Sequence, residues 1–179
     1  MIRTLHRAAQ IIPLAAIVMA AGLVPAAAES PTLLGAFKEW AAYTQGKAGT
    51  KVCYVLSQPK TSLPRHVNRD PIFFLVSDWP ARKTKGETEM VAGYPYKDDS
   101  KVTVRVGSDK FTFFTRNDGT DGSAWIQNLS EEPRLIAAMR RGSQMIVTGT
   151  SSRGTLTTDT FSLSGISAAL DKIHASCGM

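Results

Sequence analysis

The sequence has 179 residues, of which 43% are hydrophobic and 20% are charged, and its 21 Lys and Arg outnumber its 15 Asp and Glu. A chain of this length forms one domain and buries a sizeable core without metals or many disulfides. The net charge of +6 becomes +4 once two arginines leave with the N-terminal segment described next, which is too small to indicate nucleic-acid binding.

The first 28 residues have the three parts of a secretory signal peptide. Met1–Gln10 carries basic side chains, Ile11–Val24 is an apolar run, and Pro25–Ala28 supplies the small residues of a cleavage site. The alternative is an uncleaved membrane anchor, but the run is short for a span of roughly 20 residues and Pro13 interrupts it. We therefore predict cleavage after the last of these alanines, export to the periplasm or cell envelope, and a single domain of residues 29–179.

The first half of this domain contains three predicted strands and two other segments. Pro31–Tyr43 has apolar residues at helical spacing but equally fits an edge strand. Pro59–Asp70 combines two prolines with basic residues and predicts a loop. The strands are Val52–Leu56, Ile72–Val76, whose continuous apolar run is typical of a strand covered on both faces, and Glu87–Ala92.

An antiparallel hairpin follows, and it has the cleanest alternation in the chain. Val102–Val106 and Phe111–Phe114 predict two strands with one buried face. Asn117–Gly122 carries turn residues and predicts a loop, and Ala124–Ile126 predicts another short strand.

A helix is predicted over Ser130–Arg141. Ser130 is expected to be its N-cap, Pro133 fits its first turn, and Gly142 follows its basic C-terminal end. These residues mark both ends of the helix.

A hairpin and a second helix close the chain. Met145–Thr150 and Leu156–Leu163 are rich in β-branched residues, and Gly154 between them can adopt the positive φ of a hairpin loop. The hydrophobic period then changes to that of a helix. Its apolar face comprises Ile166, Ala169, Leu170, Ile173 and Cys177.

Together these elements predict a mainly β fold, an antiparallel β-sandwich or barrel-like sheet of about eight strands with one inserted helix and a C-terminal helix.

Cys53 lies in the first clear strand and Cys177 on the inner face of the last helix. Two cysteines in an exported chain are expected to be oxidised together, and two buried free thiols are the alternative. The disulfide would close nearly the whole domain.

No catalytic, cofactor-binding or metal-binding motif is found. Neither His66 nor His174 belongs to a recognised metal-ligand motif in the sequence, and no glycine-rich loop leads from a strand into a helix. The nearest approach to a nucleophile elbow, Gly149–Arg153, lacks the second glycine and is interpreted as a turn. Because the members of a Ser-His-Asp triad are neighbours only in space, an unrecognised hydrolase remains an alternative.

Basic side chains gather in two loops that flank the strand Ile72–Val76. One interpretation is solvated loop charge, and the other is a surface for anionic envelope polymers or lipid headgroups, whose attraction would weaken with salt. Whether the two loops form one patch is left open by the sequence. The candidate residues are Lys60, Arg65, Arg69, Arg82, Lys83 and Lys85.

The chain resembles the invasion-associated locus B family along nearly the whole of residues 29–179. The resemblance is carried by the runs Lys51–Lys60, Arg69–Ser77, Gly93–Pro95, Ala124–Trp125, Met139–Gly142, Ser152–Thr155, Asp159–Leu163 and the terminal Cys177. It implies a β-rich exported envelope protein of Gram-negative bacteria, and it supplies no catalytic residues. Better-known members of this family carry a further cysteine soon after the early tryptophan, which Trp40–Tyr43 lacks.

The function that we expect is therefore a non-enzymatic periplasmic or envelope binding protein without a cofactor. Its partner would be an anionic envelope polymer or another envelope protein, and not a nucleic acid. Contact with a membrane would occur only through the signal peptide or at the periphery. An exported host-contact or invasion factor is the first alternative, and a hydrolase is the second.

Overall fold

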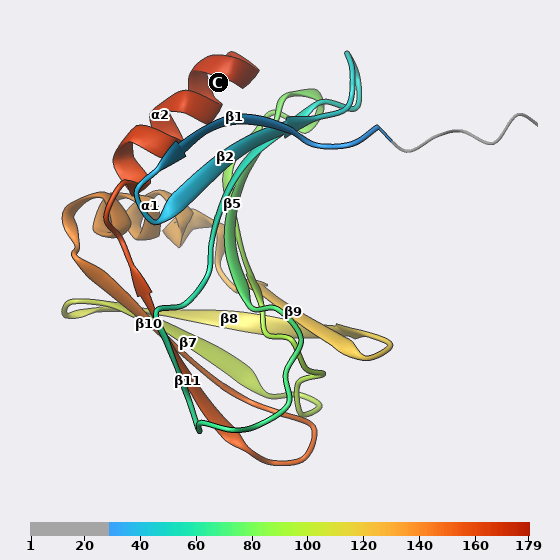
Figure 1. Ribbon diagram of the computed structural model, residues 1–179, viewed down its shortest axis with the longest axis vertical. Helices are drawn as coiled ribbons and strands as arrows, with labels where there is room; N and C mark the ends of the chain where they lie inside the picture. Colours follow the sequence, from blue (N-terminus) through green and yellow to red (C-terminus); the bar gives the residue numbers. More distant parts are fainter. Residues whose placement is uncertain (1–28) are drawn as a thin grey trace, which may run out of the picture.

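The computed structural model describes residues 29–179, so the predicted signal peptide lies outside the described residues. This part of the chain contains eleven antiparallel strands, two helices and two short 3₁₀ turns (Figure 1). The strands are β1 (Thr32–Phe37), β2 (Trp40–Gln45), β3 (Val52–Ser57), β4 (Thr61–Leu63), β5 (Phe73–Trp79), β6 (Thr84–Val91), β7 (Lys101–Val106), β8 (Asp109–Asp118), β9 (Asp121–Ile126), β10 (Gln144–Thr150) and β11 (Leu156–Ser162). The 3₁₀ turns are η1 (Pro80–Arg82) and η2 (Leu129–Glu131), and the helices are α1 (Glu132–Arg141) and α2 (Ile166–Cys177).

All eleven strands belong to one sheet in the order β1-β2-β3-β5-β6-β9-β8-β7-β10-β11-β4. Figure 1 shows that this sheet bends, with β1, β2 and β5 in its upper part and β7, β8, β10 and β11 in its lower part. The two parts meet through aromatic side chains, because Phe74 of β5 lies 6.2 Å from Phe113 of β8 and 5.9 Å from Phe161 of β11 between ring centroids. The predicted mainly β antiparallel fold with one inserted helix and one C-terminal helix is confirmed, with eleven strands in a single sheet in place of about eight.

The core lies on the inner face of the bend, and both helices cover it. α2 packs on β1, β2, β3 and β5, whereas α1 packs on β6, β7, β8 and α2. All five residues of the predicted apolar face of α2 are buried, so the helical period identified that face correctly. Within residues 29–179, no helix is both long enough and apolar enough to cross a membrane.

The N-terminal segment is a β-hairpin and not a helix. β1 pairs with β2 around a turn at Lys38 and Glu39, and β1 is the outer strand of the sheet, as the edge-strand alternative predicted. Trp40 is buried, and its indole Nε1 donates a hydrogen bond to the Ser162 carbonyl at 3.0 Å. The helical spacing of the apolar residues was therefore a coincidence of a short hairpin in which β2 buries Trp40 and Ala42, while β1 packs only the partly buried Leu34 and Phe37 against the core.

Three local predictions differ from the structure for identifiable reasons. The predicted loop Pro59–Asp70 contains β4, which pairs with three residues of β11, a partner that lies almost 100 residues further along the chain. At α1, Ser130 is not the N-cap, because Asn128 Oδ1 accepts the Ser130 N–H and η2 precedes the α-helix. The predicted loop Asn117–Gly122 is also tighter than expected, since β8 and β9 continue into it.

The predicted disulfide between Cys53 and Cys177 is present, with Cα atoms 6.0 Å apart. It joins β3 to the last turn of α2 across 124 positions of sequence. The alternative of two free thiols is therefore not realised in this structure.

Candidate functional site

The two basic loops lie at opposite ends of β5 and do not form one patch. Lys60, Arg65 and Arg69 precede the strand, whereas Arg82, Lys83 and Lys85 follow it. A strand of seven residues separates its ends by about 20 Å. In Figure 1 the turn after β5 lies near the C-terminal end of α2, while β4 lies at the opposite end of the molecule. The two groups therefore have to be considered separately.

Arg69 is a structural residue and not part of an exposed surface, which corrects its place among the candidate residues. Its guanidinium donates two hydrogen bonds of 2.8 Å to the carboxylate of Asp159 on β11, and their side chains are only 6% and 2% exposed. It also donates to the Ala92 carbonyl and lies 4.8 Å above the ring of Tyr94. Arg69 thereby fastens the segment before β5 to two other parts of the sheet.

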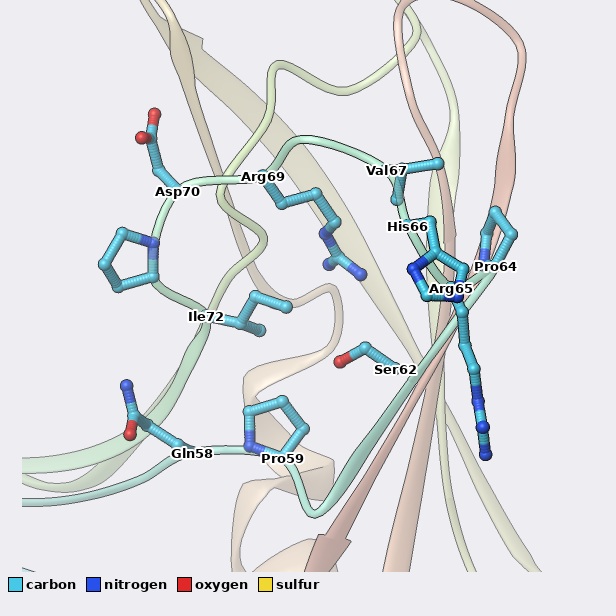
Figure 2. A pocket seen from close by; sticks show the side chains of 11 residues that line it. Gln58, Pro59, Ser62, Pro64, Arg65, His66, Val67, Arg69, Asp70 and Ile72 are labelled. Atoms are coloured by element: carbon cyan, nitrogen blue, oxygen red, sulfur yellow. The ribbon is translucent and has the colours of Figure 1, made fainter.

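The two remaining basic residues before β5 are exposed, but acidic groups accompany them. Lys60 forms an ion pair of 3.0 Å with Glu39. Arg65 and Asp70 are both exposed and point away from the pocket that this segment encloses, whereas Arg69 points into it (Figure 2). The pocket holds about 650 Å³ and is lined entirely by this segment, from Gln58 to Ile72. Little net positive charge is left at this end.

The end that follows β5 keeps its positive charge. Arg82 stacks 4.3 Å above the Trp79 ring and pairs with Glu87 at 3.0 Å. Lys83 and Lys85 are exposed, and neither forms an ion pair with any residue of 29–179. Lys83 also has a φ of 53°, which an L-amino acid with a side chain rarely adopts.

Two further lysines lie at this same end. Lys51 Nζ donates to the Ser176 carbonyl at 2.5 Å, so it caps the C-terminal end of α2. Lys172 is exposed and precedes Ser176 by four positions, which places it one helical turn away on the same flank. We call the group of Lys51, Arg82, Lys83, Lys85 and Lys172 the cationic end.

The cationic end is built around a buried His–Asp pair that the sequence did not reveal. Asp78 of β5 is fully buried, and its Oδ2 lies 2.6 Å from Nδ1 of His174 on α2. Its other oxygen accepts the Gly86 N–H at 2.9 Å. The two residues are 96 positions apart, so no local pattern could have indicated their contact. The pair fastens α2 and the start of β6 to β5 beside the disulfide.

A second buried carboxylate lies under α1. Glu132 Oε1 accepts hydrogen bonds from the backbone N–H and the hydroxyl of Thr88. Burial raises the pKa of Glu132 above its ordinary value of 4.5, and the bonds from Thr88 partly oppose this rise. Burial also raises the pKa of the neighbouring Glu89, so both carboxyls favour the protonated form more than free glutamate does.

No group of three or more His, Cys, Asp or Glu within residues 29–179 is arranged to hold a metal ion. His66, the other histidine of the domain, is exposed on the segment that precedes β5 and lines the pocket of Figure 2. His174 makes no further side-chain hydrogen bond within the described part of the chain. Its contact with Asp78 therefore serves the packing of α2.

The chain is similar to known proteins in both sequence and fold. The family profile described as "Invasion associated locus B (IalB) protein" matches residues 40–174. Among solved structures, the crystal structure of invasion associated protein b from Bartonella henselae is similar, with a TM-score of 0.53 and 16% sequence identity over 81% of this chain and 98% of that one. At that identity the similarity shows a shared fold. No curated protein sequence matches the chain.

Proposed function

Because the chain belongs to the invasion associated locus B family, we propose that it is a non-enzymatic binding protein of the bacterial envelope whose cationic end contacts an anionic envelope polymer. The resemblance noted in the sequence is thus confirmed at the level of the family. The location in the periplasm or envelope rests on the predicted signal peptide and is supported by the disulfide, which is typical of proteins that fold outside the cytoplasm.

The observation that carries the proposal is the difference in charge between the two ends of β5. Before β5, Arg69 and Lys60 are neutralised by carboxylates. At the cationic end, Lys83, Lys85 and Lys172 have no carboxylate partner within the described residues, and the only carboxylates paired there are Asp78 with His174, Glu87 with Arg82 and Asp171 with Arg140. A group of exposed lysines attracts anionic polymers, and salt screens this attraction.

The proposed function is non-enzymatic because the groups at the cationic end attract anions and are not placed to make or break covalent bonds. The buried Asp78 carboxylate already accepts two hydrogen bonds, from Gly86 and with His174, and these contacts hold secondary-structure elements together. The exposed lysines are flexible point charges, which suit a polymer with repeated anionic groups.

The test is salt-dependent retention on lipopolysaccharide and on purified peptidoglycan. The protein is expected to bind one of them at low salt and to be released at high salt. If each lysine near an anionic lipid surface contributes about 1 kcal/mol, the double change Lys83→Ser, Lys85→Ser should weaken binding to lipopolysaccharide about 30-fold.

The matched control removes the same charge from the other end. Lys60→Ser, Arg65→Ser also lowers the net charge by two, but it acts before β5, about 20 Å away. This variant should keep nearly all of its binding. Equal losses in both variants would mean that only net charge matters, and no retention at low salt would remove the proposal.

Direct host contact is the second candidate, and the name of the family favours it. It requires the protein to reach the outside of the cell. Labelling of intact cells with a membrane-impermeant amine reagent, followed by purification of this chain, tests the requirement. A pool that becomes labelled only after the outer membrane is opened would exclude direct contact.

A further inference from the structure

A second pocket, which the proposed function does not use, adjoins the first and shares Val67, Arg69 and Asp70 with it. It holds about 730 Å³, a volume that falls within the range of small-ligand sites, about 300–1,000 Å³. Three connections form most of its walls, namely Val67–Asp70, Gly93–Pro95 and the β10–β11 turn with its flanks, and the β8–β9 turn adds Gly119 and Thr120. We call it the hydroxyl pocket, because serine and threonine are its most frequent lining residues.

The walls of the hydroxyl pocket are fixed to one another by backbone hydrogen bonds. Asp70 N–H donates to the Gly93 carbonyl at 3.0 Å, and Ser152 N–H donates to the Pro95 carbonyl at 2.8 Å. A Cβ at Gly93 would lie 2.1 Å from the Asp70 carbonyl oxygen, so only glycine permits this approach. The pocket is therefore preformed, which lowers the entropic cost of binding a ligand.

The polar groups on its floor already have partners. Arg69 is paired with Asp159, and the Tyr94 hydroxyl lies 2.6 Å from Thr157 Oγ1. Burial raises the pKa of Tyr94, so this hydroxyl stays neutral in the physiological range. The floor supplies the Tyr94 ring, one face of which Arg69 covers, and no unpaired charge.

The polar side chains on the rim of the pocket have no hydrogen-bond partner within residues 29–179. The side chains of Asn68, Thr120, Ser152 and Arg153 are exposed and form no hydrogen bond with another residue of 29–179. They come from three separate connections and line one cavity, so one ligand can reach several of them. Arg153 and the exposed Asp70 are the rim's only charged residues, and their charges are opposite.

This combination of neutral hydrogen-bonding groups, an aromatic side chain and balanced charge matches the chemistry of a sugar. A saccharide offers many hydroxyls that both donate and accept, together with apolar C–H faces that pack on aromatic rings. A polyanion would gain little from a site whose charges cancel. We propose that the hydroxyl pocket binds a neutral saccharide of two or three rings.

The test is a titration of the ¹⁵N-labelled residues 29–179 with tri-N-acetylchitotriose and maltotriose, followed by NMR at low and high salt. At least one sugar should bind with a Kd of about 1 mM or tighter and with little dependence on salt. The amide signals that shift should be those of residues 67–70, 93–95, 119–120 and 151–155. Binding of neither sugar at about ten times that concentration overturns the proposal.

Three variants separate this site from the cationic end. Thr120→Trp, in the exposed β8–β9 turn, should fill the pocket and weaken sugar binding at least tenfold, while Thr103→Trp, on the outer face of β7, should leave it unchanged. Lys83→Ser, Lys85→Ser should bind the sugar normally, so failure of the proposed function would leave this result unaffected. Sugar binding that survives Thr120→Trp, or that high salt abolishes, would place the ligand elsewhere and overturn the proposal.

Discussion

At the scale of single residues, the main correction concerns Arg69. It stands among prolines and other basic residues, a context in which a charged side chain is normally exposed. The fold instead buries it against Asp159, with 90 positions of sequence between them. A buried charge is tolerated only with a partner, and that partner could not be identified from the sequence because strand β11 meets this segment only through long-range pairing.

The Arg69–Asp159 pair should dominate the response of this segment to mutation. Arg69→Met leaves the Asp159 carboxylate buried without its partner, which is expected to lower the free energy of unfolding by about 3–5 kcal/mol. Adding Asp159→Leu should recover much of this loss, because no charge then remains buried. Urea denaturation followed by tryptophan fluorescence measures both effects.

The control for this prediction is the exposed pair Lys60–Glu39, whose side chains are 55% and 38% exposed. Lys60→Met should change the free energy of unfolding by less than about 1 kcal/mol. If Arg69→Met costs no more than Lys60→Met, the buried pair does not have the role that we assign to it.

Glu132 gives a prediction about pH. Its pKa in the folded state is raised above 4.5, so the folded protein binds this proton more tightly than the unfolded chain does. Stability from this group is therefore greatest at low pH and decreases as the pH rises above 4.5 towards neutrality. Glu132→Gln keeps an oxygen for the Thr88 hydrogen bonds and removes the titration.

The variant should accordingly gain stability relative to the native sequence between pH 4.5 and pH 7. Urea midpoints measured at several pH values in this interval test the difference, in which contributions from other carboxyls cancel. A constant difference across the interval would show that Glu132 does not titrate there with a raised pKa.

At the scale of elements, periodic segments were predicted well and short or irregular ones were not. The apolar stripe of α2 and the alternation of β7 and β8 identified their buried faces, because each repeats over several residues. β4 has three residues and is strand-like only because β11 pairs with it. For β1 and β2, a turn of two residues mimicked helical spacing, and the sequence alone could not choose between the alternatives.

The candidate site could be predicted only in part for the same reason. The basic residues after β5 were found from composition, since an exposed loop keeps its charges whatever the fold. The His174–Asp78 contact and the hydroxyl pocket were missed, because each combines elements that are distant in the sequence. Cys53 and Cys177 were paired correctly because an exported chain with two cysteines leaves one choice.

The disulfide should matter most for the elements that it joins. Replacing Cys53 and Cys177 by alanine removes the cross-link that closes a loop of 124 positions. The chain-entropy model gives a loss of at most about 5 kcal/mol in the free energy of unfolding. Hydrogen exchange should increase first in α2 and in β2 and β3, on which α2 packs, and later in β7 to β10. A uniform loss of protection over the whole sheet would contradict this assignment.

At the scale of the whole molecule, the two ends of β5 have different electrostatic character. Within the described part of the chain, at one end Lys60 and Arg69 form ion pairs and Arg65 alone of the three basic residues has none, whereas the other end has the unpaired, exposed Lys83 and Lys85. Lys83 occupies its exposed position at an energetic cost. Its φ of 53° costs a residue with a side chain about 1 kcal/mol or more.

Lys83→Gly should therefore separate binding from stability. Relief of the strained φ offsets the greater freedom of glycine in the unfolded chain, so the free energy of unfolding should stay within about 1 kcal/mol of its native value. Retention on lipopolysaccharide should nevertheless fall about fivefold, the equivalent of one lysine. Loss of stability without loss of retention would contradict both parts.

The strand order has a consequence for synthesis. The chain leaves β3 near one edge of the sheet, pairs β4 with β11 at the opposite edge, and returns to β5. Residues 156–177 therefore supply the partners of β4, Arg69 and Cys53 alike, and they are synthesised after all the other helices and strands of residues 29–179. A nascent chain cannot complete this fold until residues 156–177 have been synthesised, a delay that would suit the export predicted from the sequence of residues 1–28.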